Sequence, residues 1–356
     1  MQPDHPDPPA PTPGPDGRDW NALRFGLGAG RDHVESFFLK ANEPSGDRAL
    51  WLRATVFVSA REPQRPLAEG WAIAFDRRAG RARHVAVKHT VPFATAAFDA
   101  HRLGATWTLA GRDGQPDEGV TLRPGEARGR ITTREHSIGW DLAWAGEARP
   151  LVPLFHPRLY TAPFPKSKLV TPYPTLDFRG SLEVDGERWQ IDGWRGMQGH
   201  NWGRGNADLY AWSHCNLWDG GADFVLEGAS ARVRVGPVLT PLTTTICVRH
   251  RGVAYDFNTP GSMWKAHGDV GLRRWTFSSA SRLARIESEV EAATDDFVGL
   301  HYPNPDGTMT YCLNSKLARA RVRFEVLGRA PVELSSRAAA LEIGTLDDAH
   351  GVRMYL

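Results

Sequence analysis

Apolar side chains recur at every second position in short segments along most of this chain. Residues 71–76 and 138–144 place Trp, Ile, Leu or Phe at alternate positions, and residues 49–58 are apolar at nearly every position. Successive side chains of a β-strand point to opposite faces, so a period of two indicates strands. Helical periodicity is scarce, and residues 284–290 also alternate. We therefore predict an all-β protein.

Asp-Gly pairs separate several of these segments. Asp113-Gly114, Asp185-Gly186 and Asp306-Gly307 each lie between plausible strands, and Asp-Gly is a strong signal for a tight hairpin turn. Many short strands joined by turns favour antiparallel barrels or sandwiches.

Proline content divides the chain. Residues 1–18 are rich in Pro and Asp and are predicted to form a disordered tail. Seven prolines between residues 150 and 175 predict a connector with little regular sheet. We therefore expect an N-terminal β-barrel over residues 19–150, a connector over 151–175 and a C-terminal β-barrel over 176–356 that carries the functional site.

Composition excludes several classes of protein. The 43 basic and 41 acidic residues of the 356 leave a net charge of +2, and the arginines are scattered, so nucleic acid is not an expected partner. The three cysteines are widely spaced and predict no disulfide framework. No secretory signal and no long apolar run are visible, so we expect a cytoplasmic protein without a transmembrane segment.

The densest cluster of Gly, Trp and His spans residues 193–218. In a strand, His200 and Trp202 would point together. A second run places polar and aromatic residues on one face and small, largely apolar residues on the other. The polar and aromatic face consists of Tyr210, Trp212, His214, Asn216 and Trp218. Such a face suits the wall of a ligand cavity inside the second barrel.

Two blocks of residues resemble one family. Residues 35–53, with Ala49-Leu-Trp-Leu52, and the block Gly199-His-Asn-Trp-Gly203 are similar to the lipocalin-like two-barrel proteins that include carotenoid 1,2-hydratase, kievitone hydratase and tocopherol cyclase. The resemblance implies two packed barrels and a ligand site in or beside one of them. It also implies a catalytic His-x-Trp pair, which corresponds to His200 and Trp202. The family's later Tyr-x-Asp pair has no clean counterpart, and Glu227 stands near its place.

Glu227 is the expected acid. Hydration of an unactivated C=C bond needs a donor strong enough to protonate carbon, and a carboxyl group in an apolar pocket stays neutral because burial raises its pKa. The predicted catalytic residues are His200, Trp202 and Glu227. The predicted substrate-binding residues are Asn201, Tyr210, Trp212, His214 and Trp218. The expected ligand is a hydrophobic isoprenoid, polyene or polyketide-like molecule, which the protein could meet at a membrane surface, and the expected chemistry is hydration, cyclisation or isomerisation.

Other interpretations remain open at this point. His200 could brace a turn, Trp202 and His214 could be ordinary core residues, and Glu227 could pair with Arg232 or Arg234 on a solvent-facing strand. The protein could also be a carrier of an apolar ligand, or a scaffold whose barrels are filled by side chains. No metal or cofactor is expected, because no zinc-type spacing, phosphate loop or nucleophile elbow is present, and Gly26–Gly30 lacks a strand-to-helix context.

Overall fold

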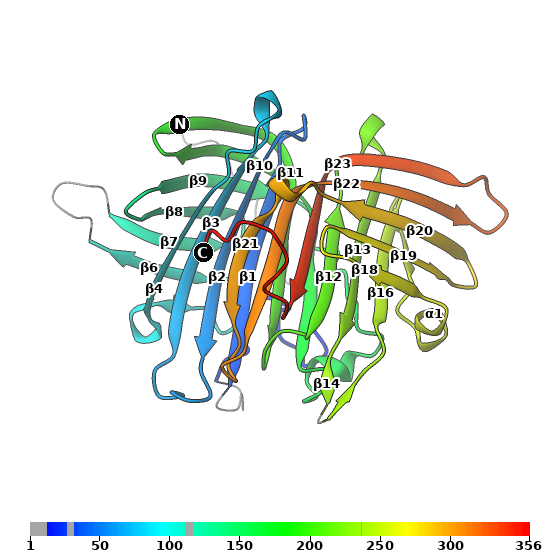
Figure 1. Cartoon of the computed structure of the whole chain (residues 1–356), viewed down its shortest axis with the longest axis horizontal. Coiled ribbons are helices and arrows are strands. Elements are labelled where there is room, and N and C mark those ends of the chain that lie inside the picture. The colour runs from blue at the N-terminus through cyan, green and yellow to red at the C-terminus, as the bar shows by residue number, and fades with distance from the viewer. Residues whose placement is uncertain (1–12, 27–31, 111–116, 236) are drawn as a thin grey trace.

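Two large antiparallel sheets lie side by side and make up almost the whole molecule (Figure 1). The computed structural model describes residues 13–26, 32–110, 117–235 and 237–356. Each sheet curls around its own apolar interior, and a third cluster of buried apolar residues lies between them. The predicted all-β class with two packed barrels is confirmed.

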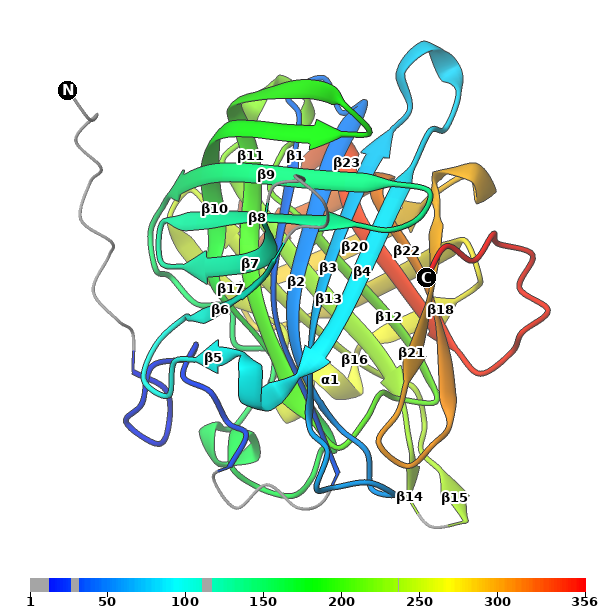
Figure 2. The same ribbon diagram turned by 90° about the vertical axis from the view of Figure 1, so that its left-hand side faces the viewer.

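The first sheet has eleven strands in the order β4-β3-β2-β1-β11-β10-β9-β8-β7-β6-β5. It curls so that β3 and β4 pack across the interior against β8 and β9 (Figure 2). Its strands are β1 (His33–Asn42), β2 (Arg48–Val58), β3 (Leu67–Asp76), β4 (Val85–Pro92), β5 (Ala97–Phe98), β6 (Ala105–Leu109), β7 (Glu118–Arg123), β8 (Glu126–Thr132), β9 (Ser137–Ala145), β10 (Ser167–Val184) and β11 (Glu187–Gly203).

The second sheet has ten strands in the order β17-β16-β13-β12-β23-β22-β20-β19-β18, and β21 pairs with β22 beside this path. Its strands are β12 (Leu209–Cys215), β13 (Phe224–Arg232), β16 (Thr243–His250), β17 (Val253–Asp256), β18 (His267–Val270), β19 (Arg274–Ala280), β20 (Ala284–Glu291), β21 (Val298–Pro303), β22 (Met309–Val326) and β23 (Val332–Thr345).

The remaining elements are short. Strands β14 (Arg234–Val235) and β15 (Val238–Leu239) form a small ribbon, and α1 (Pro260–Trp264) is one helical turn. The 3₁₀ turns are η1 (Arg78–Gly80), η2 (Phe93–Thr95), η3 (Pro157–Tyr160), η4 (Asp219–Gly221) and η5 (Thr294–Asp296). No helix in the described part of the chain has the length and apolar character needed to cross a membrane.

Local sequence patterns located many elements correctly. The segments at 49–58, 71–76, 138–144 and 284–290 lie in β2, β3, β9 and β20. Asp185 and Gly186 join β10 to β11 with φ of 49° and 85°, the left-handed conformation that a tight hairpin requires. Asp306-Gly307 joins β21 to β22. Asp113-Gly114 lies outside the described residues.

The predicted boundary between the barrels, at residues 150–176, is wrong. Strand β10 pairs with β9, and β11 pairs with β1, so the first sheet continues to Gly203. The long β10–β11 hairpin returns the chain to its first strand. This pairing is between residues far apart in sequence, which alternation within a segment does not reveal.

The predicted connector and tail also need correction. Strand β10 starts at Ser167, within the Pro-rich segment, and its register shifts between Val170 and Tyr173 and again between Tyr173 and Leu176. Pro172 and Pro174 lie at these irregularities, where the missing N–H groups disturb the ladder least. Residues 1–12 of the predicted tail lie outside the described residues. The following segment has defined structure, because Pro13 bridges Asp19 and Asp16 forms an ion pair with Arg24 at 2.7 Å.

Alternation along β1 explains how the two sheets meet. Phe37 and Leu39 point into the interior of the first barrel, whereas Phe38 packs edge-on against Trp212 of the second sheet. Lys40, on the same face as Phe38, donates to the Ala338 carbonyl of β23. Each central strand therefore contributes one face to its own barrel and one to the space between barrels.

Candidate functional site

A cavity of about 460 Å³ lies between the two sheets. This volume is within the range of small-molecule sites in proteins. Strands β1 and β2 form one wall, and β12, β13, β21 and β23 form the opposite wall. Aromatic rings dominate both walls, contributed by Phe38, Trp51, Tyr210, Trp212 and Tyr302.

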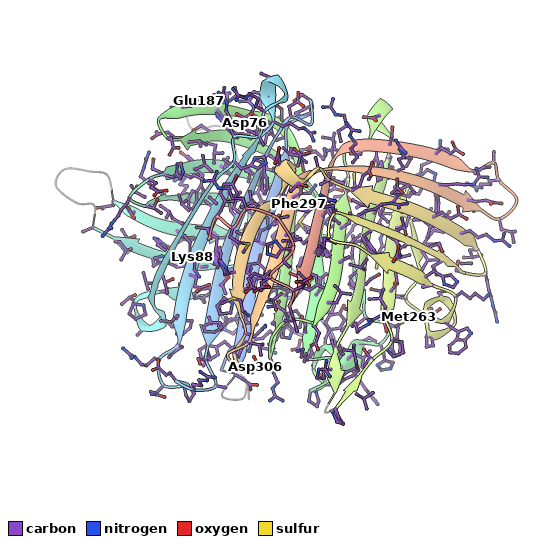
Figure 3. The ribbon with its side chains drawn as sticks, viewed as in Figure 1. Asp76, Lys88, Glu187, Met263, Phe297 and Asp306 are labelled. Atoms are coloured by element: carbon purple, nitrogen blue, oxygen red, sulfur yellow. The ribbon has the colours of Figure 1, made fainter. Side chains whose placement is uncertain are left out.

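The segment before β10 closes another side of this cavity. Leu154, Phe155, Leu159 and Phe164 contribute apolar side chains there. Met263 of α1, labelled in Figure 3, also lines the cavity. Phe155 and Phe164 are 46% and 55% exposed, so this apolar edge is also where the cavity meets the surface.

Glu227 lies directly behind the Trp212 wall. It is buried, and its Oε1 accepts hydrogen bonds from Trp212 Nε1 and Thr171 Oγ1, both at 2.8 Å. Its Oε2 has no hydrogen-bond partner among the described residues. Burial raises the pKa of Glu227 to about 7, although the two hydrogen bonds act in the opposite direction. Its side chain is therefore largely protonated below neutral pH, and it does not pair with Arg232 or Arg234.

His214 lies opposite Glu227 on the neighbouring strand. It is buried, and neither ring nitrogen forms a hydrogen bond of standard geometry within the described residues, although the Pro174 backbone acts on the ring as an acceptor. Burial, followed by the positive charge of Lys40, lowers the pKa of His214 well below its usual value. His214 is therefore neutral, and together with Glu227 it forms a buried polar group whose hydrogen-bonding capacity is mostly unused.

Glu342 is a second carboxylate at the cavity, and the sequence reasoning missed it. It lines the cavity on β23 and is the cross-strand partner of Trp212. Lys316 Nζ donates to Glu342 Oε1 at 2.7 Å. Trp212 thus lies between two carboxyl groups in different environments. That of Glu227 is buried without an ion-pair partner among the described residues, and that of Glu342 is paired with Lys316. Strand alternation over residues 338–342 could have indicated it, since Glu342 lies on the same face as Ala340, which is buried between the sheets.

His200 and Trp202 lie elsewhere, and the expectation that they share a cavity with Trp212 is wrong. Both residues are on β11 of the first sheet and face the first barrel, where His200 stacks on Phe37 with ring centroids 4.2 Å apart. His200 Nε2 lies 2.9 Å from Glu35 Oε1, and Nδ1 lies 2.7 Å from the Trp20 carbonyl oxygen. The imidazole ring braces the segment before β1, and Trp202 packs with it.

Glu35 is the centre of this brace. It accepts the backbone N–H groups of Arg24 and Phe25 and approaches the rings of His33 and His200. Burial by itself raises the pKa of Glu35, but the histidine hydrogen bonds outweigh it and lower the pKa to about 2. Every oxygen lone pair is used, so this cluster has the character of a structural support.

The other predicted binding residues do not all line the cavity. Asn201 and Tyr210 line the cavity together with Trp212. Trp218 lies beyond the end of β12 in the second barrel's core and donates to the Phe224 carbonyl at 2.6 Å. Asn216 also lies past the end of β12 and bonds the Gly196 carbonyl. The period-two pattern continued in sequence past the point where the strand ends. No cluster of three metal-ligating side chains occurs among the described residues.

The sequence profile of tocopherol cyclase-like proteins matches residues 177–345 of this chain. An uncharacterized protein of Mycobacterium tuberculosis is 30% identical over 228 residues, which cover 62% of this chain and 67% of that protein. The chain belongs to one family with this mycobacterial protein, and its residues 177–345 are tocopherol cyclase-like. This confirms the resemblance to lipocalin-like two-barrel proteins.

Solved structures are similar to this chain in fold at low sequence identity. The crystal structure of CghA with Sch210972 has a TM-score of 0.56 at 11% identity and covers 88% of each chain. Kievitone hydratase from Nectria haematococca has a TM-score of 0.49 at 11% identity, covering 96% of this chain and 98% of that one. The similarity to CghA shows that the two-barrel fold extends over most of this family member.

Proposed function

We propose that this protein is an enzyme that acts on a hydrophobic isoprenoid, polyene or polyketide-like molecule bound between its barrels. The proposed chemistry is acid-initiated hydration, cyclisation or isomerisation of a C=C bond. The observation that carries this proposal is the placement of Trp212 at the cavity wall between Glu227, whose pKa is about 7, and Glu342, which is paired with Lys316. Two carboxyl groups in contrasting environments suit one acid and one base.

Glu227 serves as the proton donor in this proposal. Its pKa keeps a large fraction protonated near neutral pH, as a general acid requires. Rotation of the Trp212 side chain breaks the bond to Glu227 Oε1 and opens the carboxyl group to the cavity. The proton then forms a C–H bond at one alkene carbon, the π bond breaks, and the other carbon becomes cationic.

The cavity walls suit the cation that follows. The π-faces of Phe38 and Tyr210 at the cavity wall attract positive charge, and Glu342 adds a carboxylate at the same site. In hydration, water adds to the cation, its proton passes to Glu342, and exchange with solvent restores Glu227. In cyclisation an internal nucleophile adds instead, and in isomerisation a neighbouring C–H bond loses its proton.

Asn201 and Tyr210 keep their predicted substrate-binding role in this proposal, because they line the cavity. His200, Trp202 and Trp218 do not, since their hydrogen bonds and packing support the barrels. The family-derived role of His200 and Trp202 is replaced here by structural support, and His214 acts only by keeping the surroundings of Glu227 uncharged.

Purified protein incubated with a panel of isoprenoids and polyenes tests the proposal by mass spectrometry. We expect a product heavier by one water, or an isomer of unchanged mass. Glu227→Gln keeps an acceptor for Trp212 and Thr171 but cannot donate an acidic proton, so activity should fall by about 100-fold or more. Glu342→Gln should also lower activity, whereas Glu333→Gln, on an exposed ion pair, should not. Unchanged turnover in Glu227→Gln would remove Glu227 as the donor.

A carrier of an apolar ligand is the second candidate. The observation that favours it is that Glu227 lies behind Trp212 and does not itself line the cavity. A carrier releases its ligand chemically unchanged. Extraction of ligand from protein incubated with the same panel separates the two functions: recovery of only the starting compound, in a stoichiometric amount, supports the carrier.

A further inference from the structure

A buried arginine without a carboxylate partner lines the same cavity. Arg53 of β2 is 9% exposed and lies on the face that points to the second sheet. Its one hydrogen bond within the described residues joins Nη2 to Ser36 Oγ at 2.6 Å. The Nε atom is buried and has no hydrogen-bond partner in the described part of the chain. A buried cation that lacks an anion is unusual, because charge loses its hydration on burial.

The two carboxylates whose charge acts on Arg53 are already paired with lysines. Glu69 accepts from Lys88 Nζ at 2.8 Å, and Glu342 accepts from Lys316 Nζ at 2.7 Å. Neither forms an ion pair with Arg53, and both act on it only from a longer distance. The charge of Arg53 is thus left without a direct counter-ion in the described part of the protein.

Three aromatic rings surround the guanidinium group of Arg53. Its central carbon lies 4.5 Å from the centroid of the Tyr302 ring, 5.7 Å from that of Trp71 and 5.8 Å from that of Trp51. Stacking of this kind stabilises a cation and fixes its orientation. It leaves the N–H groups at the edge of the guanidinium plane, which are the groups that bind a carboxylate in a two-pronged geometry.

The cavity is polar around Arg53 and apolar at its surface edge. Arg53, Tyr302 and Glu342 lie among the central strands, whereas Leu154, Phe155 and Phe164 form the edge that meets the surface. We propose that the ligand is an amphiphile whose acidic head, a carboxylate or an acidic enol, binds Arg53 while its hydrocarbon body extends towards Phe155 and Phe164. This inference rests on the proposed function, since it names the class of substrate for the same cavity.

The test compares two fluorescent probes that differ only in charge. At pH 8, cis-parinaric acid is an anionic polyene, and its methyl ester is the neutral equivalent. We expect the wild-type protein to bind the acid about tenfold or more tightly than the ester, because charge-assisted hydrogen bonds are the stronger kind. Equal affinity for the two probes, or no saturable binding of either, would overturn the proposal without any variant being needed.

Variants then test whether Arg53 causes the preference for the acid over the ester. Arg53→Met should lose the preference for the acid and keep its affinity for the ester, and Arg53→Lys should keep part of the preference. Arg128→Met, on an exposed ion pair of the first barrel, is the matched control and should behave like wild type. Ala229→Trp, which fills the cavity wall, should weaken both probes. A preference that survives in a folded Arg53→Met variant contradicts the assignment.

The binding and turnover experiments can contradict the two proposals separately. Acid-selective binding through Arg53 with no product from any acidic substrate would leave this inference standing and would contradict the proposed enzyme. Turnover of neutral substrates that is indifferent to Arg53→Met would contradict this inference and support the enzyme.

Discussion

Each sheet carries a buried glutamate beside a histidine, and the two pairs have opposite electrostatic character. Glu35 in the first barrel receives two backbone N–H groups and approaches two histidine rings, and its pKa falls to about 2. Glu227 in the second sheet receives two donors on one oxygen and none on the other, and its pKa rises to about 7. Both glutamates are almost completely buried, so the number and kind of hydrogen-bond donors decide whether the pKa rises or falls.

This difference separates support from chemistry. Both ring nitrogens of His200 lie within hydrogen-bond distance of an oxygen atom, one from Glu35 and one from the Trp20 carbonyl. His214 forms no hydrogen bond of standard geometry through either nitrogen among the described residues, and its pKa lies well below the usual value. A buried carboxylate with every oxygen hydrogen-bonded fixes a structure, whereas a carboxyl group with an unpaired oxygen and a raised pKa keeps its proton available.

The largest effect is expected from Glu35→Gln. Glutamine removes the charge that His200 faces and presents an amide N–H to donors that need an acceptor. The free energy of unfolding should fall by about 3–5 kcal/mol, the usual cost of breaking a buried ion pair, as measured by urea denaturation. Glu333→Gln, on an ion pair whose side chains are largely exposed, should cost less than about 1 kcal/mol. Similar losses in both variants would show that the Glu35 cluster is not a structural support.

The pH dependence of stability should distinguish the two glutamates. For Glu227 the folded state holds a proton that the unfolded chain releases above pH 4.5, so stability falls as pH rises from about 4.5 to about 7 and then levels. The difference between wild type and Glu227→Gln should change by about 3 kcal/mol over this interval. For Glu35 the folded pKa is lowered, so its stabilisation is complete above about 4.5 and is lost as pH falls towards 2. Urea curves at several pH values measure both, and a flat difference for Glu227 would contradict its raised pKa.

Trp212→Phe sharpens the assignment of Glu227. Phenylalanine keeps an aromatic wall but removes the indole N–H that donates to Glu227 Oε1. Since that hydrogen bond lowers the pKa of Glu227, the fall in stability with pH should extend to higher pH, with a loss of about 1 kcal/mol at neutral pH. Trp51→Phe removes an indole N–H that has no hydrogen-bond partner among the residues the structure describes, so it is the control and should leave the pH midpoint in place.

The smallest effect is expected from His214→Leu. An unpartnered buried polar ring contributes no hydrogen bond to lose, and an apolar replacement of similar size is often neutral. The free energy of unfolding should change by less than about 1 kcal/mol, whereas His200→Leu should cost several times more because it leaves Glu35 without its partner. Thermal denaturation of the two variants side by side gives the comparison. Equal losses would mean that His214 has a structural hydrogen bond after all.

Much of the candidate site was visible in the sequence, and part of it was misplaced. The face that carries Tyr210 and Trp212 followed from alternation, and Glu227 was selected from its apolar neighbours. Arg53 and Glu342 were missed because each lies in a segment that reads as ordinary strand. Arg53 and Glu342 line opposite walls of one cavity. They are 289 positions apart in the chain, and no local sequence pattern relates them.

The sequence alone determined the strands, several of their turns and the faces that side chains share, because these depend on neighbours one to four positions away. Only the tertiary structure decided which barrel each strand joins. Glu35 and His200 meet across 165 positions because β11 pairs with β1. That pairing places His200 inside the first barrel and leaves Trp212 and Glu227 facing the space between the two sheets. Strand alternation is a short-range property of the chain, whereas sheet order depends on contacts between distant segments.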